Sequence, residues 1–200
     1  GWGRPVGRSR QMRVLLLPLS FIYGLIIIVR SILYNNNLLK SLRISVPVIS
    51  VGNITAGGSG KTPITIHLAE EAKKRGYKPG IISRGYGRKS KGLCIIHDGI
   101  SLKESVGSSG DEPFLMASLL KNVPIVVSKN KAEGAQKLVD EFDTDLIILD
   151  DGFQHRKLHR DIDVVLINSN EKEKSYKLLP AGQLRESLQG LKRADYVAIT

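Results

Sequence analysis

The fold is decided by one stretch, Pro47-Val-Ile-Ser-Val-Gly-Asn-Ile-Thr55-Ala-Gly-Gly-Ser-Gly60-Lys61-Thr62. Its apolar run at 48–51 predicts a buried strand, and a glycine-rich turn follows that strand. From position 61 onward apolar residues recur at helical spacing, so a helix is predicted over 62–75. A strand, a glycine loop, Gly-Lys-Thr and a helix, in this order, are typical of a phosphate-binding loop.

The chemistry of such a loop explains its residue types. Glycines let the backbone turn so that N–H groups point at phosphate oxygens, and the helix dipole adds to this field. Lys61 is expected to reach the β- and γ-phosphates, and the Thr62 hydroxyl to coordinate Mg²⁺. The usual first glycine is replaced by Thr55, so a glycine turn without a ligand stays the alternative. The predicted ATP-binding residues are Thr55, Ala56, Gly57, Gly58, Ser59, Gly60, Lys61 and Thr62.

The 200 residues suit one domain with a short appendage, and their basic charge is uneven. Residues 1–69 contain eight Lys and Arg and no Asp or Glu, and therefore carry +8 of the net +11. The sequence thus predicts no nucleic-acid-binding face, and no obligate protein partner is inferred. Cys94 is the only cysteine, which excludes an internal disulfide and fits a reducing compartment. His155 and His159 are four apart, but no third ligand lies nearby, so a zinc site is disfavoured.

The segment 14–29 is almost entirely apolar, with Arg13 before it and Arg30 after it. As a helix it is about 24 Å long, against a hydrocarbon core of about 30 Å. A buried core helix needs no basic residues at both ends, and a signal peptide would need a cleavage site that is missing here. We therefore predict an anchor that inserts into a membrane or lies at its surface. Residues 31–45 are the predicted connector, and Met12 is the predicted natural start.

From position 46 onward, strand-like and helical patterns alternate along the chain. This alternation predicts an α/β fold of the P-loop NTPase type, with a mostly parallel sheet flanked by helices. We predict two parts, a leader with an anchor helix and connector at 1–45 and a P-loop domain at 46–200. The predicted strands are 48–51, 80–83, 93–96, 124–128, 145–150, 162–167 and 196–199, and the predicted helices are 62–75, 112–121 and 130–142.

Ligands of such sheets bind beyond the carboxyl ends of the strands, and basic residues lie at two of these ends. Arg84-Gly-Tyr86-Gly-Arg88 offers two guanidiniums on a flexible backbone. It either holds a phosphate or is a basic surface turn. Lys129 and Lys131 follow another strand, where they either face phosphate or are solvated.

Acidic residues lie at two further strand or helix ends. Asp111 and Glu112 open a helix, where acidic residues are ordinary dipole partners. The functional alternative makes Asp111 a general base and Glu112 a metal carboxylate. The strand at 145–150 runs into Asp150-Asp151, and a carboxylate there, opposite a phosphate loop, is suited to the Mg²⁺ shell. The alternative is a polar turn, although two adjacent aspartates repel each other unless a cation or hydrogen bonds compensate.

Together and in this order, these motifs resemble the tetraacyldisaccharide 4′-kinase family, the lipid A 4′-kinases of Gram-negative bacteria. The resemblance spans about residues 12–200. A Ser or Thr in place of the first loop glycine is normal in that family, so Thr55 supports the resemblance. The matching segments are 12–18, 47–63, 83–88, 110–113, 150–155, 160–163 and 179–186.

The resemblance implies a bacterial inner-membrane enzyme whose active site faces the cytoplasm. Such an enzyme uses ATP and Mg²⁺ to phosphorylate the 4′-hydroxyl of a tetraacyldisaccharide 1-phosphate, a lipid A precursor. It also implies site residues. Catalytic roles fall to Asp111 and Lys61, positions near Mg²⁺ to Thr62, Glu112, Asp150 and Asp151, and substrate contacts to Arg84, Tyr86, Arg88, Gln154 and His155. Family members continue beyond this region, so the chain is expected to be the N-terminal portion of such a protein.

Two other functions compete with this one. A membrane-associated partitioning or chaperone-type ATPase carries a second lysine in the loop, and the corresponding residue here is Ala56. A membrane-anchored nucleotide-binding regulator has no catalytic step. The acidic residues at 111–112 and the cluster at 150–155 favour an enzyme over such a regulator.

Overall fold

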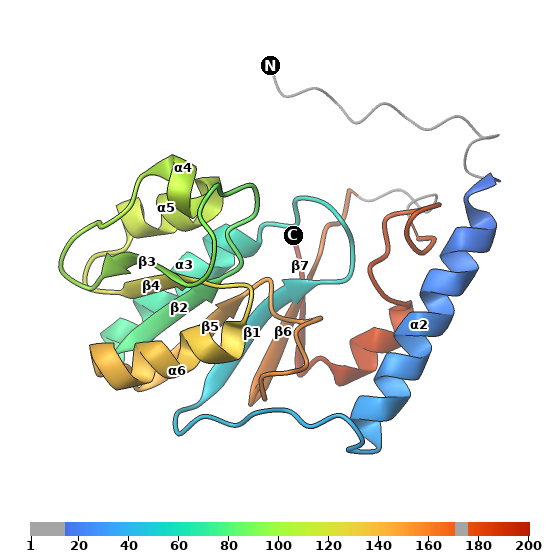
Figure 1. The fold of residues 1–200 in the computed structure, drawn as a ribbon, viewed down its shortest axis with the longest axis horizontal. Helices are drawn as coiled ribbons and strands as arrows, with labels where there is room; N and C mark the ends of the chain where they lie inside the picture. Colours follow the sequence, from blue (N-terminus) through green and yellow to red (C-terminus); the bar gives the residue numbers. More distant parts are fainter. Residues whose placement is uncertain (1–14, 171–175) are drawn as a thin grey trace.

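A seven-stranded sheet forms the centre of the fold, with the strand order β3-β4-β2-β5-β1-β6-β7 (Figure 1). The computed structural model describes residues 15–170 and 176–200, so the predicted start at Met12 and the flanking Arg13 lie outside the described residues. The strands are β1 Val48–Asn53, β2 Pro79–Ser83, β3 Cys94–Asp98, β4 Pro124–Val127, β5 Leu146–Asp150, β6 Ile162–Ile167 and β7 Tyr196–Ile199.

The prediction of a mostly parallel sheet is confirmed. Each of the pairs that join β4, β2, β5, β1, β6 and β7 is parallel. Only β3 departs from this pattern, because it pairs with β4 in the antiparallel direction at one edge of the sheet. The carboxyl ends of the six parallel strands therefore meet at one edge of the sheet, where the loops that carry the predicted site residues begin.

Helices cover both faces of this sheet, as predicted. The described helices are α2 Leu17–Asn35, α3 Lys61–Lys74, α4 Val106–Ser109, α5 Asp111–Leu119, α6 Lys131–Phe142 and the 3-10 helix η2 Leu188–Arg193. Neighbouring residues of β2 point to opposite faces, as they must in a strand. Ile81 packs into the core beneath α3 and α5 with Ala69 and Met116, whereas Ile82 packs into the core beneath α6.

The apolar segment forms α2, which lies beside the sheet rather than on one of its faces (Figure 1). The segment 176–195, red in Figure 1, runs between α2 and the strands and closes a third small core around Phe153. The predicted connector at 31–45 is wrong in its first part, because the helix continues to Asn35. Arg156 donates hydrogen bonds to Ser31 and to Asn35 Oδ1, at 2.9 Å for the latter, and these bonds hold the last turn.

Candidate active site

The glycine loop delivers its lysine to the start of α3. Gly60 adopts a left-handed backbone, with φ of +72°, and Lys61 is the first helical residue. Residues with a side chain adopt this backbone conformation less readily than glycine, so glycine is favoured at the turn. Two side-chain hydrogen bonds hold the loop in place. Asn168 donates to the carbonyl of Gly58 at 3.3 Å, and Thr200 donates to the carbonyl of Ser59 at 3.3 Å.

A cleft of about 860 Å³ opens in front of this loop. One wall is built by the carboxyl edge of the sheet, through the glycine loop 57–63, the turn 83–86, the start of α5 and the end of β5. The other wall is built by α2 and by residues Leu179 and Arg185 of the segment 176–195. We call these the sheet wall and the α2 wall.

Asp150 lies at the carboxyl end of β5, deep in the sheet wall. Its side chain is buried, and one carboxylate oxygen accepts a hydrogen bond from Ser83 at 2.7 Å. The other oxygen, Oδ1, is buried without a hydrogen-bond partner among the described residues. Burial raises the pKa of Asp150, and Lys131 and the bond from Ser83 oppose that rise. A buried carboxylate oxygen without a partner is suited to a cation.

Asp151 follows with a left-handed backbone, at φ of +51°, which turns its side chain toward the glycine loop. Lys61 Nζ lies 3.6 Å from its Oδ1, and Arg185 Nη1 lies 2.9 Å from each of its oxygens. Burial by itself would raise the pKa of Asp151, but Arg185 and Lys61 outweigh burial and lower it. Asp151 therefore stays ionised and holds two cations at the mouth of the cleft.

Lys131, left open by the sequence, is buried beneath this acidic pair. Its ammonium donates to the backbone carbonyls of Asp150 and Asp151, the second at 2.8 Å. Burial lowers the pKa of Lys131 to about 8, although the neighbouring carboxylates act in the opposite direction. Lys131 is therefore not a solvated surface lysine, whereas Lys129 is exposed at the rim of the cleft.

Asp111 and Glu112 occupy the first turn of α5 and line the cleft. Both residues are exposed, so a bound molecule can reach them. Loss of water around its carboxyl, followed by the charge of Asp150, raises the pKa of Glu112. Gly110 directly precedes the helix, and a Cβ added to it would lie 2.8 Å from the carbonyl oxygen of Tyr86. This close approach joins the two loops that carry the predicted acidic and basic residues.

The side chains of the basic turn after β2 lie in two different places. Arg84 and Tyr86 line the cleft, and Tyr86 is 89% exposed. Arg88 points elsewhere, because its guanidinium donates to the carbonyl of Gly92 and, at 3.4 Å, to that of Val127. The structure thus does not bring Arg88 together with the other predicted substrate residues.

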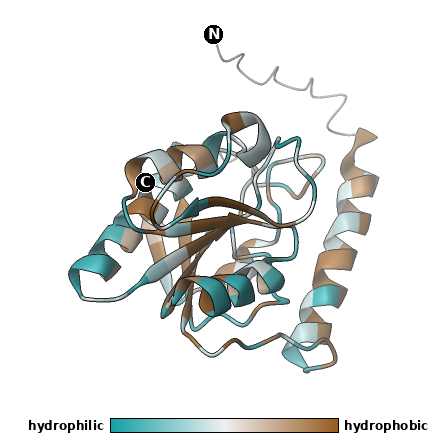
Figure 2. Cartoon of the chain, turned by 60° about the vertical axis from the view of Figure 1, so that its left-hand side comes forward, coloured by the Kyte–Doolittle hydropathy of each residue, from teal (hydrophilic) through white to brown (hydrophobic). Residues whose placement is uncertain are grey.

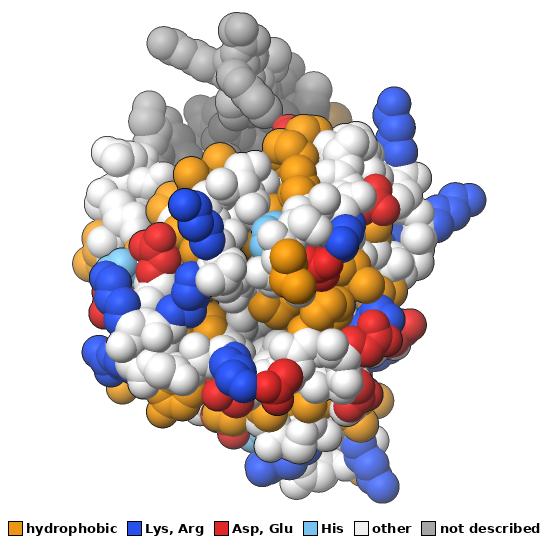
Figure 3. Space-filling view, turned by 90° about the vertical axis from the view of Figure 1, so that its left-hand side faces the viewer, with side chains coloured by type: hydrophobic (Ala, Val, Ile, Leu, Met, Phe, Trp, Pro, Cys, Tyr) orange, Lys and Arg blue, Asp and Glu red, His pale blue; other side chains and the backbone are white. Residues whose placement is uncertain are grey.

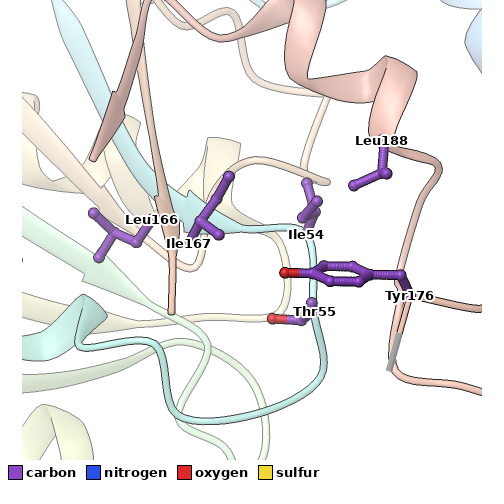
Figure 4. A pocket seen from close by; sticks show the side chains of 6 residues that line it. All are labelled: Ile54, Thr55, Leu166, Ile167, Tyr176 and Leu188. Atoms are coloured by element: carbon purple, nitrogen blue, oxygen red, sulfur yellow. The ribbon is translucent and has the colours of Figure 1, made fainter. Parts of the chain in front are cut away.

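Thr55 and Ala56 also lie outside the cleft, whereas Gly57, Gly58, Ser59, Gly60, Lys61 and Thr62 line it. Thr55 is buried and lies beside Tyr176 in a separate apolar cavity of about 230 Å³ (Figure 4). Ala56 donates its backbone N–H to the carbonyl of Gln183 at 2.7 Å. These two residues tie the glycine loop to the segment 176–195 rather than facing the cleft.

Gln154 and His155 line the cleft just beyond the acidic pair. The Gln154 amide donates at 2.8 Å both to the carbonyl of Asn53 and to Glu186 Oε1, which fixes its orientation. Burial, followed by the charges of Lys131 and Arg160, lowers the pKa of His155 to about 4. His155 is therefore neutral near pH 7, and its buried Nε2 has no hydrogen-bond partner in the described chain.

The α2 wall contains the residues that the sequence analysis missed. Tyr23 donates to the carbonyl of Arg185 at 2.7 Å, and Arg30 donates to that of Gln154 at 2.9 Å. These bonds join residues more than 120 positions apart. No local pattern signals such contacts, although the polar residues Tyr23 and Ser20 interrupting an apolar helix could have indicated a packed face.

The residues of the cleft fit part of a Mg²⁺ ligand set. Within residues 15–170 and 176–200 no group of three or more His, Cys, Asp or Glu is arranged to hold a metal ion by itself. Mg²⁺, however, usually binds through one or two carboxylates together with substrate phosphates and water. The unpartnered Oδ1 of Asp150 is the observation that fits this kind of site.

Comparison with known proteins gives a consistent result. The sequence profile of a family described as tetraacyldisaccharide-1-P 4′-kinase matches residues 12–200. A tetraacyldisaccharide 4′-kinase of Aquifex aeolicus is 46% identical over 95% of this chain, and one of Chlorobium luteolum is 41% identical over 96%. The chain spans 59% and 55% of the lengths of these two relatives.

The fold comparison agrees. A crystal structure of LpxK from Aquifex aeolicus in complex with ATP superimposes with a TM-score of 0.88 and is 46% identical in sequence. The match covers 94% of this chain and 59% of that chain. The two proteins are therefore similar in sequence as well as in fold.

Proposed function

The chain belongs to the tetraacyldisaccharide-1-P 4′-kinase family, and from this membership we propose that it transfers the γ-phosphate of ATP to the 4′-hydroxyl of a tetraacyldisaccharide 1-phosphate in lipid A biosynthesis. One observation carries the proposal for this chain. The cleft gathers the lysine of a phosphate-binding loop, an ionised aspartate and a buried carboxylate oxygen that has no hydrogen-bond partner within the described residues. Phosphoryl transfer needs this combination of cations and metal-binding carboxylates.

On the nucleotide side, the backbone of the glycine loop 57–60 would cradle the phosphates at the start of α3. Lys61 would leave Asp151 and bind the β- and γ-phosphates, which carry more negative charge than one carboxylate. Arg185 would stay on Asp151 and keep its carboxylate facing the cleft. The ion pair at 3.6 Å therefore holds Lys61 near its working position before ATP arrives.

Asp150, with Thr62, Asp151 and Glu112 near it, is the proposed holder of Mg²⁺. When bound, Mg²⁺ would supply the positive charge that neutralises the transferred group. Ser83 keeps the Asp150 carboxylate oriented through its 2.7 Å hydrogen bond. Lys131 beneath the pair fixes the backbone that carries both carboxylates.

On the acceptor side, Asp111 is the proposed general base. Its carboxylate is exposed on the cleft wall, so a sugar hydroxyl can reach it and give up its proton as the phosphate transfers. Arg84, Tyr86, Gln154 and His155 are the proposed substrate contacts. His155 would act as a neutral hydrogen-bonding group, because its pKa of about 4 leaves it uncharged near pH 7.

We further propose that α2 holds the protein at the cytoplasmic leaflet of the bacterial inner membrane, so that residues 1–45 are the anchor part and 46–200 the kinase part. By length and composition α2 is the one described helix able to cross a membrane. The helix is coloured mostly as hydrophobic along its length (Figure 2). On its outward face Phe21 is 76% and Leu25 54% exposed, whereas Ser20, Gly24 and Tyr34 are buried against the protein. A helix with one packed face and one apolar face is suited to lie in the membrane interface.

A transfer assay tests the proposal. The intact protein is incubated with Mg²⁺, ATP labelled at the γ-phosphate and a tetraacyldisaccharide 1-phosphate in neutral-detergent micelles. We expect the label in the lipid, at the 4′ position. Label in inorganic phosphate alone would favour the P-loop ATPase, nucleotide binding without turnover would favour the regulator, and either result contradicts the proposed kinase.

A further inference from the structure

A second hollow of about 350 Å³ lies between α2 and η2, and we call it the α2–η2 groove. Four basic side chains line it, namely Arg30, Arg156, Lys192 and Arg193. Among the described residues, Glu186 is the one acidic side chain in its lining, and it already pairs with Arg193. The groove therefore holds an excess of positive charge.

Neutral groups hold two of these cations in place. Arg30 and Arg156 both lie over the ring of Tyr34, at 5.6 and 4.8 Å from its centre. Arg156 also donates to Asn35 Oδ1 at 2.9 Å. Burial lowers the pKa of Arg156, and the neighbouring charges of Arg193, Arg160 and Arg30 lower it further. Neither guanidinium pairs with a carboxylate of the part of the chain that the structure describes, and such fixed guanidiniums are suited to a bidentate phosphate.

The groove is continuous with the cleft. Both are lined by Ile27, Arg30 and Gln154, so a molecule longer than a single sugar can occupy the two together. Its other rim carries Ile28 and Ile32, which are 55% and 51% exposed and belong to the outward face of α2. The opposite side of the molecule is different, because acidic and basic side chains are mixed there (Figure 3).

We propose that the α2–η2 groove binds the phosphate group of the lipid acceptor, with Arg156 and Lys192 as the principal contacts. This inference rests on the proposed function, since the acceptor named for the family carries a phosphate at position 1 and reacts at position 4′, on the other sugar. With the 4′-hydroxyl at Asp111 in the cleft, the second sugar extends past Gln154 toward the groove. The acyl chains then follow the apolar rim at Ile28 and Ile32.

The test compares binding of two acceptors in neutral-detergent micelles, one with the 1-phosphate and one without it. We expect the protein to bind the phosphorylated lipid about tenfold more tightly, which is the usual effect of hydrogen bonds to a charged group. Arg156→Gln and Lys192→Gln should each lose most of that preference and bind the unphosphorylated lipid as before. Lys157→Gln, an exposed basic neighbour outside the groove, is the matched control and should keep the preference.

Lys192 is exposed, and no hydrogen bond of its side chain occurs in the described chain, so its variant should fold even if Arg156→Gln loosens α2. A preference unchanged in both variants would overturn the inference, as would an equal loss for both lipids. So would variants that lose binding only to phosphatidylglycerol vesicles, which would assign the groove to membrane phospholipid, or tight binding of inorganic phosphate alone. Because binding needs neither ATP nor turnover, the result is separate from that of the transfer assay.

Discussion

The two walls of the cleft differ in how their side chains are held. In the sheet wall, Lys61 begins α3, Asp150 ends the buried strand β5, and Asp151 follows directly on β5. In the α2 wall, Tyr23 and Arg30 reach loops more than 120 residues away through single hydrogen bonds at 2.7 and 2.9 Å. The sheet wall gathers the groups that we propose for phosphate and metal, whereas the α2 wall gathers those proposed to meet a lipid.

This difference indicates a division of labour. The loops of the sheet wall follow parallel strands, such as β2 and β5, that are buried on both faces. The α2 wall combines apolar surface with a few polar anchors, so changes there should alter how the acceptor binds more than how the phosphate moves. The following predictions test this division, beginning with the largest expected effect.

Lys61→Ala should lower turnover roughly 10²–10³-fold, because one charge directed at the transferred phosphate is removed. The unfolding midpoint should change little, since the side chain faces the cleft rather than a core. The measurements are lipid phosphorylation and thermal unfolding of the intact protein. Lys74→Ala, at the exposed end of the same helix, is the matched control, and normal turnover in Lys61→Ala would refute the phosphate loop.

The second prediction concerns the charge buried beneath the acidic pair. The pKa of Lys131 is lowered from 10.5 to about 8, so between these values the unfolded chain binds the proton more tightly than the folded chain. The free energy of unfolding should therefore rise with pH in this window, by about 2 kcal/mol between pH 7.5 and 9.5 from this group. Denaturant titrations at both pH values should give that rise in the unmodified protein and a smaller one in Lys131→Met. Equal slopes would show that Lys131 is not perturbed.

The third prediction moves to the α2 wall. Replacing Phe21 and Leu25 together by serine removes apolar surface from the outward face, and should raise the apparent KM for lipid about tenfold with little change in kcat. Leu119→Ser, an exposed apolar residue on α5, is the matched control. The measurements are vesicle co-sedimentation and lipid kinetics. A fall in kcat at unchanged KM would place α2 in the transfer step instead.

The difference between the two walls also determines which features the sequence could predict. Features that depend on neighbouring residues were predictable from their local sequence patterns. They are the strand at 48–53, the glycine loop and the acidic end of β5, and the structure has them within one or two residues of their predicted positions. The helix at 111–119 ends two residues earlier than predicted, and the short α4 has no periodicity from which to predict it. The antiparallel direction of β3 depends on pairing with β4, which its own residues do not specify.

Long-range contacts explain the remaining differences in the site. Arg88 and Thr55 lie in motifs that predict binding residues, but neither side chain lines the cleft. Arg88 donates to a backbone carbonyl, and Thr55 lines a separate cavity. Arg185 belongs to the site because its guanidinium lies 2.9 Å from the carboxylate of Asp151, which is 34 positions away in the sequence. Such partners follow from the packing of α2 and the segment 176–195, and not from spacing along the sequence.

One measurement tests the central claim, that the sheet wall separates metal binding from proton transfer. Asp150→Asn and Asp111→Asn are compared in the intact protein, with nucleotide binding and turnover measured across Mg²⁺ concentration. Asp150→Asn should weaken Mg²⁺-dependent ATP binding and be partly relieved by more Mg²⁺. Asp111→Asn should lower kcat by roughly 10²–10⁴-fold with little change in nucleotide affinity. The claim is contradicted if Asp111→Asn weakens Mg²⁺-ATP binding as much as turnover, or if Asp150→Asn leaves the Mg²⁺ dependence unchanged.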